Sequence, residues 1–248
     1  MLQIVSLFDA YSLRARLLPA LLLVLPTATV VALLFPGVYA TLSRTFGSLG
    51  VVAAGLFFLA HVIRARGRQL EKRLFSEWGG IPTTVWLRHR DSSLDSTTKV
   101  RYHIFLTARI AGLQMPSPAM ENEDPTAADK SYTSAVKWLL EFTRNTKLFP
   151  LVFNENVYYG FRRNTLAAKP IALCLLGLAA ALAAWITKRR YGWNVDAWGN
   201  DVIAAWAVIL ACAPPWILLV TKGWVKDGAH AYARALLAAC DGVSSAST

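Results

Sequence analysis

The stretch "LLPALLLVLPTATVVALLFP", residues 17–36, is long and apolar enough to cross a lipid bilayer as a helix. A bilayer core requires about 20 mostly apolar helical residues, with roughly 17 as the lower limit. Three further stretches meet or approach that length, at residues 47–63, 170–187 and 202–221. The chain has a mean hydropathy of +0.38 and only 17% charged residues. These features predict an all-helical membrane protein with four transmembrane helices.

The spacing of the four spans predicts three regions. Residues 1–63 would form an N-terminal transmembrane hairpin, and residues 170–248 a second hairpin with a C-terminal tail. Residues 64–169 would form a basic, mainly helical domain inserted between the hairpins. An alternative for the first span is a cleaved signal peptide, with Arg14 and Arg16 before it and "VYA" at 38–40 after it. A retained span is favoured because signal peptides usually carry only 7–15 apolar residues.

The distribution of Lys and Arg predicts that both termini and residues 64–169 face the cytoplasm. Positive charges near span ends concentrate on the cytoplasmic side of multi-pass proteins. Four cations fall on the other side in this arrangement: Arg44, Lys188, Arg189 and Arg190. Thirteen fall on the cytoplasmic side: Arg14, Arg16, Arg64, Arg66, Arg68, Lys72, Arg73, Arg162, Arg163, Lys169, Lys222, Lys226 and Arg234.

The inserted region carries helical signals. Leu70, Leu74 and Trp78 recur every four residues, so the second span is expected to continue beyond the membrane as a stalk. Asp95 or Ser96 and Asp124, the latter followed by proline, are expected helix caps. Residues 147–153 are the single predicted strand, and Asn154 is the expected cap of a helix that runs into the third span.

The stretch "VWLRHRDSSLDSTTKVRYHIF", residues 85–105, carries four Lys or Arg and two His in an otherwise apolar chain. Guanidinium groups bind phosphate through paired hydrogen bonds, so a pocket for a nucleotide or short oligonucleotide is one interpretation. Its expected ligand-binding residues are Arg88, His89, Arg90, Lys99, Arg101, His103, Arg162 and Arg163.

Simpler interpretations stand beside the ligand pocket. The cations of residues 85–105 are equally consistent with solvated helix faces paired with Asp91 and Asp95, and those of residues 64–73 with contacts to lipid phosphates. Arg162 and Arg163 are equally consistent with an anchor for the third span. The segment "HRDSSLD" at 89–95 raises the alternative of a membrane-tethered enzyme. No catalytic residue, metal site or cofactor is predicted, since no familiar catalytic or metal-binding motif occurs.

Two of the spans contain prolines that interrupt helical hydrogen bonding. Kinked helices free backbone carbonyls, which must then find other partners or water. The expected pore or gating residues are Pro26, Thr27, Thr29, Pro214 and Pro215. Four helices leave little room for a pore within one subunit, so we expect a homo-oligomer, taken as a tetramer.

The runs "EWGGIPTTVWLRHRDSSLDSTTKVRYH" and "NENVYYGFRRN", with the two-plus-two arrangement of spans, resemble a family of bacterial four-span membrane proteins. The architecture is similar to membrane effectors of nucleotide-signalled anti-phage defence, of the Hailong type. The resemblance implies an oligomeric, channel-like protein of the bacterial inner membrane, gated by a nucleotide-derived ligand, with a cytoplasmic nucleotidyltransferase as partner. A scaffold that anchors a cytoplasmic partner is the alternative function.

Overall fold

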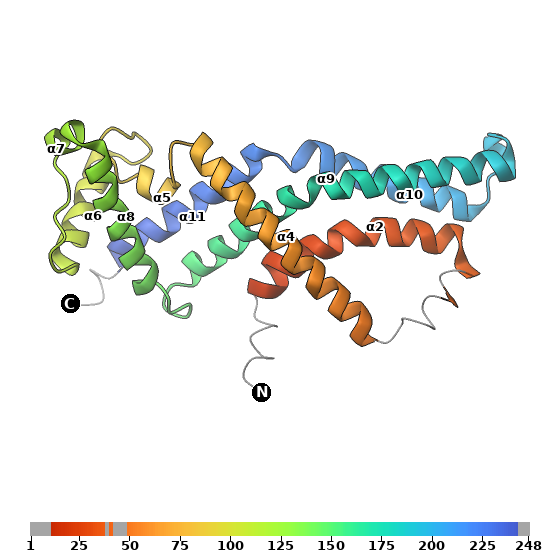
Figure 1. Ribbon diagram of the computed structural model, residues 1–248, viewed down its shortest axis with the longest axis horizontal. Helices are drawn as coiled ribbons and strands as arrows, with labels where there is room; N and C mark the ends of the chain where they lie inside the picture. The colour runs from red at the N-terminus through yellow and green to blue at the C-terminus, as the bar shows by residue number, and fades with distance from the viewer. Residues whose placement is uncertain (1–10, 38–39, 42–48, 243–248) are drawn as a thin grey trace. The chain divides into compact units, whose positions relative to one another are not determined.

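The computed structural model describes residues 11–37, 40–41 and 49–242 (Figure 1), and within these ranges the regular structure is helical with no strand. Residues 47 and 48 of the predicted second span, and Arg44 of the outer cations, lie outside the described residues. The elements are η2 (Ser12–Leu17), α2 (Leu18–Leu34), α4 (Leu49–Glu77), α5 (Pro82–Val85), α6 (Ser96–Arg109), α7 (Pro118–Glu123), α8 (Pro125–Phe142), α9 (Pro150–Tyr191), η3 (Val195–Ala197), α10 (Asn200–Pro214), η4 (Pro215–Leu219) and α11 (Lys222–Gly242).

Four helical segments are long and apolar enough to cross a membrane. They are Ser12–Leu34, Gly50–Val85, Pro150–Tyr191 and Asn200–Leu219. Their lengths and compositions indicate a multi-pass membrane protein. The second and third segments continue well past their apolar parts, as the stalk prediction requires for α4.

The chain divides into two compact units, which are described separately. The first, called the membrane unit, comprises Met1–Glu71 and Gly160–Val225. The second, called the helical unit, comprises Lys72–Tyr159 and Lys226–Thr248. Three helices, α4, α9 and α11, contain the points at which the chain passes from one unit to the other.

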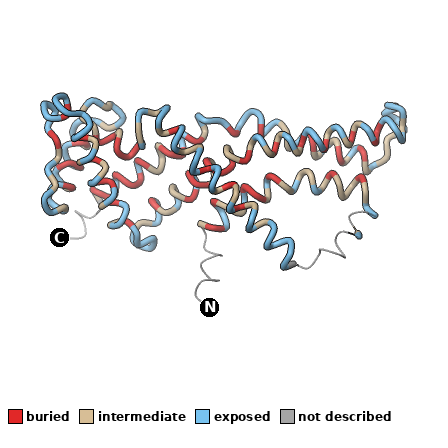
Figure 2. Tube along the Cα trace, viewed as in Figure 1, coloured by how far each residue is buried: buried red, intermediate tan, exposed pale blue. Residues whose placement is uncertain are grey.

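The core of the membrane unit has two parts. In one part, Val30 of α2 packs with Ala183 of α9 and Ala205 of α10, all of them fully buried. In the other, Leu23 of α2 and Ile63 of α4 pack near α9 and η4. Figure 2 shows buried positions recurring along α2 and α9. Small residues at several of these positions permit close helix packing.

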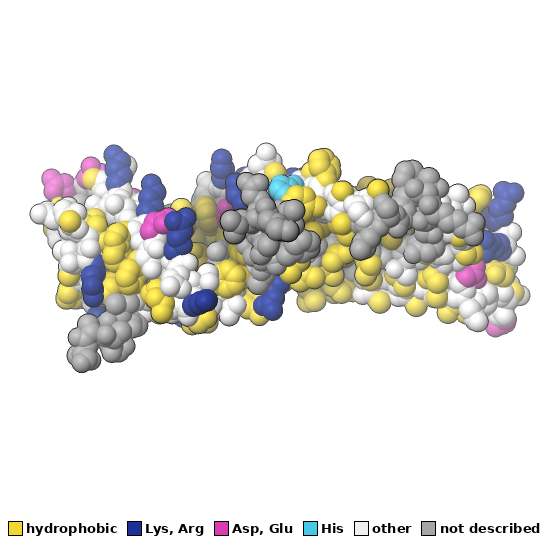
Figure 3. Space-filling model, turned by 90° about the horizontal axis from the view of Figure 1, so that it is seen from below, with side chains coloured by type: hydrophobic (Ala, Val, Ile, Leu, Met, Phe, Trp, Pro, Cys, Tyr) yellow, Lys and Arg dark blue, Asp and Glu magenta, His cyan; other side chains and the backbone are white. Residues whose placement is uncertain are grey.

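The outer surface of the membrane unit is largely hydrophobic. Leu25, Phe58, Leu178, Leu210 and Leu218 are each more than 60% exposed. Yellow side chains cover much of the visible surface over the spans on the right of Figure 3. Large exposed apolar surfaces are unusual on water-soluble monomers, and this distribution is the one expected for helices that face lipid.

The helical unit has its own core, built around the fully buried Tyr132 of α8. Leu87 follows α5, Leu106 comes from α6, and Leu236 and Leu237 come from α11. The segment after the last span, expected as a tail, therefore supplies core residues through α11. Residues 243–248 lie outside the described residues.

Several local signals in the sequence determine helix ends as expected. The side chain of Asp95 accepts a hydrogen bond from Thr98 N–H at the start of α6, and Asp124 accepts from Thr126 N–H and Ala127 N–H at the start of α8. Two predictions were wrong. Residues 147–153 contain no strand, and Asn154 caps no helix, because α9 already begins at Pro150. The Asn145 side chain forms a turn, and proline is well suited to the first helical position.

Candidate functional site

The basic stretch 85–105 lies in the helical unit, where it forms the end of α5, a loop and most of α6. Its loop is held by Glu121, which lies on the short helix α7 and is only 1% exposed. The Glu121 carboxylate accepts hydrogen bonds from His89 N–H at 2.7 Å and Arg90 N–H at 3.2 Å. It also accepts one from the Tyr132 hydroxyl at 2.6 Å.

The surroundings of Glu121 keep its carboxylate charged. Burial alone would raise the pKa of Glu121, but the hydrogen bonds from Tyr132, His89 and Arg90 and the charge of Arg90 lower it overall. Burial raises the pKa of the Tyr132 hydroxyl, and so do its hydrogen bond to Glu121 and the negative charge of that carboxylate. The buried carboxylate therefore acts as a fixed anion that binds the loop backbone.

Two arginines of the stretch are paired with acidic side chains. Arg88 donates through Nε and Nη2 to the two carboxylate oxygens of Asp129, each at 2.8 Å, and through Nη1 to Gly79 O. Arg90 lies 3.5 Å from Glu121 and 3.6 Å from Asp129, with 42% of its side chain exposed. Each of the three guanidinium nitrogens of Arg88 thus has a protein partner, whereas Arg90 remains accessible to solvent.

Lys99 and His103 stabilise the same loop from α6. The Lys99 ammonium is buried and donates to Arg88 O at 2.6 Å and to Asp91 O. Burial lowers the pKa of Lys99, although the negative charges of Asp91 and Glu121 oppose this effect. His103 Nε2 lies 2.8 Å from Leu87 O. This contact is satisfied when Nε2 carries the proton of a neutral imidazole.

The remaining two residues of the expected set within this stretch are His89 and Arg101. His89 Nε2 lies 2.8 Å from Pro116 O, and its ring is 5.0 Å from that of His103. Arg101 pairs with Asp241 of α11, with Nε 2.6 Å from the carboxylate and 54% of the arginine side chain exposed. The structure therefore brings five of the six residues together around one loop and places Arg101 on the α11 side.

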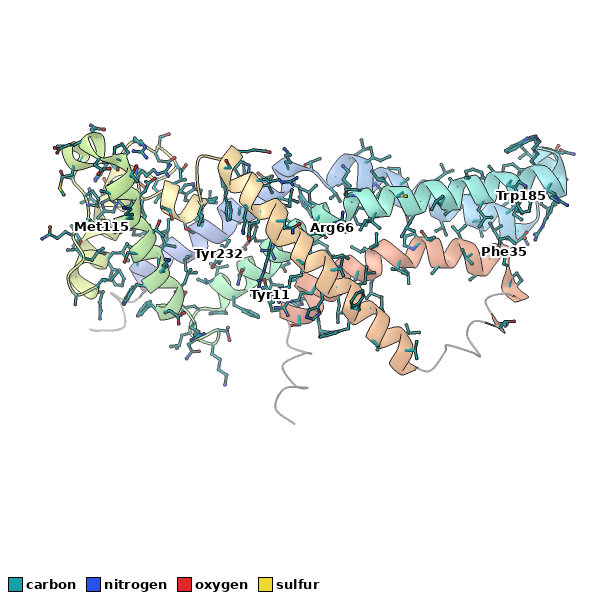
Figure 4. The ribbon with its side chains drawn as sticks, in the orientation of Figure 1. Tyr11, Phe35, Arg66, Met115, Trp185 and Tyr232 are labelled. Carbon is teal, nitrogen blue, oxygen red and sulfur yellow. The ribbon has the colours of Figure 1, made fainter. Side chains whose placement is uncertain are left out.

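Two hollows flank the side chain of His89. One has a volume of about 380 Å³ and is lined by polar groups that include Asp91, Ser96 and Lys99. The other has a volume of about 480 Å³ and is mostly apolar, with Ile104 and Met115 in its wall; Met115 is labelled in Figure 4. Volumes of roughly 300–1,000 Å³ are typical of small-molecule sites.

Arg162 and Arg163 belong to the membrane unit, whereas the six residues above belong to the helical unit. Arg163 donates to Glu71 at 2.9 Å and to the side chain of Asn164. Arg162 donates to Trp224 O at 3.0 Å, with its guanidinium 5.4 Å from the Trp224 ring. Both arginines are thus engaged with protein groups at helix junctions.

The last span changes from α-helical to π-helical geometry at Pro214 and Pro215 and ends at Val220. α10 ends at Pro214, the π-helical turn η4 follows, and Val220 leaves helical geometry before α11 begins at Lys222. The Lys169 ammonium on α9 donates to Ile217 O at 3.0 Å and to Val220 O at 2.8 Å. Carbonyls at a helix end require such partners, so Lys169 stabilises the break.

The other expected gating residues lie within a continuous helix. α2 runs from Leu18 to Leu34 through Pro26. Thr29 donates from Oγ1 to Leu25 O, four positions earlier in the helix, at 2.9 Å. The hydroxyl of Thr27 is buried and has no hydrogen-bond partner in the structure. A polar group of this kind inside an apolar bundle is costly unless it serves another contact.

Sequence reasoning missed Glu121, Tyr132 and Asp129 as partners of the basic stretch. Glu121 and Asp129 lie 31 or more positions from their hydrogen-bonded partners in the stretch, and Tyr132 bonds to Glu121. The segment "PAMENEDP" also looks like an exposed acidic loop. The role of Lys169 was missed as well. The adjacent prolines at 214–215 were the available signal, because they imply a helix end whose carbonyls need donors.

The segment "HRDSSLD" has structural roles in the helical unit. Asp95 caps α6, and Asp91 accepts a hydrogen bond from Ser93 N–H within the loop. Among the described residues, no three His, Cys, Asp or Glu side chains are grouped in a way that could hold a metal ion.

Comparison of this chain with protein-family models, with curated proteins and with solved structures finds no match.

Proposed function

We propose that the chain is a channel-like membrane effector in which a ligand bound to a cytoplasmic helical unit controls the packing of four transmembrane helices. The break between α10 and α11 supports this proposal most directly. Lys169 holds two carbonyls of that break, and Thr221 accepts a hydrogen bond from Trp224 N–H at the start of α11. We infer a second arrangement in which these few polar contacts are released, as gating requires.

The proposed topology is two hairpins with the helical unit on the cytoplasmic side of the bacterial inner membrane. It rests on the excess of Lys and Arg at one set of span ends. The opposite end of the last two spans carries Trp185 and Trp193, both about half exposed, as expected for rings at head-group depth.

Helix continuity provides a physical route for coupling. α4, α9 and α11 each contain residues of both units without an interruption. α11 starts beside the break and contributes Leu236 and Leu237 to the core of the helical unit. A ligand that prefers one arrangement of that core would shift the equilibrium of the break by its difference in affinity.

A nucleotide or short oligonucleotide is the proposed ligand, with its phosphate bound at the edge of the basic stretch. Arg90 and Arg101 are the most accessible of the cations there, with side chains 42% and 54% exposed. A phosphate would replace Asp129 or Asp241 as their partner. Since Asp241 lies on α11, its release would act on the helix that leads to the break.

Liposome flux tests the channel proposal. Purified protein is reconstituted into dye-loaded liposomes, and leakage is recorded with and without cyclic nucleotides and short oligonucleotides. We expect a nucleotide to change leakage, and Lys169→Met to change the basal leak because two carbonyls lose their donor. The control is Lys188→Met, which removes an exposed lysine from the other end of α9. Folded protein that never conducts under any of these conditions would refute the proposal.

Binding of the ligand is tested separately by calorimetry. Arg90→Gln with Arg101→Gln should weaken nucleotide binding at least tenfold, because two guanidinium–phosphate contacts are lost. Arg144→Gln is the control for the loss of one positive charge, since the Arg144 side chain is 80% exposed and lies outside the basic stretch. Unchanged affinity in the double variant would show that the phosphate lies elsewhere.

A homo-oligomer is proposed because a single set of four helices leaves little room for a pore. A role in anti-phage defence, with a nucleotidyltransferase as partner, is proposed on the resemblance of residues 77–103 and 154–164 alone.

The apolar hollow beside His89 favours a second candidate function, a membrane scaffold that binds a cytoplasmic protein. Val100 and Ile104 on the wall of this hollow are 51% and 65% exposed. Stoichiometric copurification of a cytoplasmic protein, lost with Ile104→Asp, would support the scaffold.

A further inference from the structure

Three helices of the membrane unit meet closely at one junction. Asn164 of α9 donates from Nδ2 to Ala15 O of η2 at 2.7 Å. Gly67 of α4 lies against the same asparagine, since a Cβ at this glycine would be 2.3 Å from Asn164 Oδ1. Gly160 of α9 packs against Ala15 in the same way, since a Cβ at this glycine would be 3.2 Å from Ala15 Cβ. The junction is therefore tightly packed and holds the surrounding side chains in fixed positions.

Positive charge is concentrated at this junction. Arg64 of α4 experiences repulsion from Arg16, Arg68 and Arg163. Arg163 is paired with Glu71 at 2.9 Å. Within the part of the chain that the structure describes, Glu71 pairs with one of these four arginines, and the other guanidinium groups give the junction an excess of positive charge that favours an anion.

Arg16 provides a donor directed into this cluster. Its Nη1 donates to Ser12 Oγ at 3.2 Å, and its guanidinium lies 5.2 Å from the ring of Tyr11. Its Nε is buried and has no hydrogen-bond partner in the structure. A buried donor on a charged group is costly when it is unpaired. Tyr11 and Arg66, which lie near the junction, are labelled in Figure 4.

The position of the junction along the spans indicates where the anion comes from. Arg16 precedes the apolar part of the first span, and Arg64 directly follows that of the second. Both arginines are therefore at the boundary between hydrocarbon and water, where lipid phosphates are present at high local concentration. Arginine binds phosphate through two parallel hydrogen bonds.

We propose that Arg16 and Arg64 bind the phosphate of one anionic lipid head group at the junction of η2, α4 and α9. Arg68 adds positive charge that acts on Arg64, and Asn164 fixes the helices that carry the two arginines. The bound lipid would join the first two spans to α9. This site is separate from the proposed nucleotide site in the helical unit, and it does not depend on that proposal.

Native mass spectrometry of the full-length protein tests the site. The protein is released from mixed micelles that contain phosphatidylglycerol and phosphatidylcholine, and the retained lipids are counted. We expect the parent protein to retain one phosphatidylglycerol in preference to phosphatidylcholine. Arg16→Gln with Arg64→Gln should weaken this retention by about tenfold or more, as expected for the loss of two charge-assisted contacts.

The control removes the same charge from neighbouring positions on the same two helices. Arg14→Gln with Arg66→Gln should retain the lipid as the parent does, because both side chains are exposed and neither is among the charges that act on Arg64. Equal loss in the two double variants would show only a diffuse attraction and would overturn the site. Retention unchanged by Arg16→Gln with Arg64→Gln would overturn it as well.

Two further measurements separate folding and ligand source from binding. Arg16→Lys with Arg64→Lys keeps the charges, and we expect weaker retention without a change in helix content by circular dichroism. Equal retention by this lysine variant would refute paired arginine–phosphate bonding. Inorganic phosphate is added as a competitor. Displacement of the lipid by millimolar inorganic phosphate would overturn the assignment to a lipid head group in favour of a soluble anion.

Discussion

Replacement of Glu121 by glutamine gives the sharpest test of the loop that carries the basic stretch. The carboxylate is 1% exposed and accepts hydrogen bonds from His89 N–H, Arg90 N–H and the Tyr132 hydroxyl. Hydrogen bonds to charged groups contribute roughly 1.5–3 kcal/mol each, and an unsatisfied buried donor costs about 1–3 kcal/mol. The glutamine side chain keeps one acceptor oxygen, but its NH₂ group would face His89 N–H, Arg90 N–H or the Tyr132 hydroxyl, which are donors themselves.

We therefore expect Glu121→Gln to destabilise the helical unit by about 2–4 kcal/mol. Such a change corresponds to roughly a 30- to 1,000-fold increase in the exchange rate of amides that exchange only when this unit opens. Hydrogen–deuterium exchange of the detergent-solubilised protein, read in peptides covering residues 97–106 and 132–139, measures the increase. These peptides exclude the amides that bond directly to Glu121.

The control for this experiment is Glu123→Gln, which removes an exposed carboxylate two positions away. It should change exchange less than threefold, since exposed charges contribute little. Tyr132→Phe should cost about 1.5–3 kcal/mol, because it removes one hydrogen bond to the carboxylate. If Glu121→Gln and Glu123→Gln had the same small effect, the buried carboxylate would not be what holds the loop.

Two other predictions concern pH and helix packing. Burial lowers the pKa of both His103 and His230, so the folded state binds protons less readily than the unfolded chain. The contribution of these histidines to stability is therefore complete above the unfolded pKa of about 6.5 and falls as the pH drops below it. Thermal unfolding should occur at a lower temperature at pH 5.5 than at pH 7.5. His103→Gln should make this difference smaller. Gly67→Ala should destabilise the membrane unit by about 1–3 kcal/mol because the new methyl group meets Asn164, whereas Gly55→Ala, with open space around it, should change thermal stability by less than about 1 kcal/mol.

The sequence was sufficient for features that depend on neighbouring residues. The four spans follow from the length of their apolar runs, and the Asp95 and Asp124 caps follow from the residues directly after them. The predicted strand at 147–153 was wrong because apolar residues in a short run do not distinguish strand from helix. The turn at Asn145 and the helix start at Pro150 determined the outcome.

The environment of the basic residues was not predictable from their spacing. His89 and Lys99 are close in sequence, as expected for one cluster, but the partners that determine their chemistry come from α7 and from loop carbonyls. Glu121 has no local signal, because its burial results from the packing of α7 against α8. Lys169 is assigned as a cytoplasmic charge by its position, but its two bonds depend on where η4 ends.

The sidedness of the helical unit is the premise of the whole account, and cysteine labelling in intact cells measures it. In a variant with Cys174, Cys212 and Cys240 replaced, single cysteines are placed at the exposed positions Asn122, in the helical unit, and Asp196, between the last two spans. A membrane-impermeant maleimide should label the cysteine at 196 and should reach the one at 122 only after lysis. Labelling at 122 in intact cells, with protection at 196, would contradict the account.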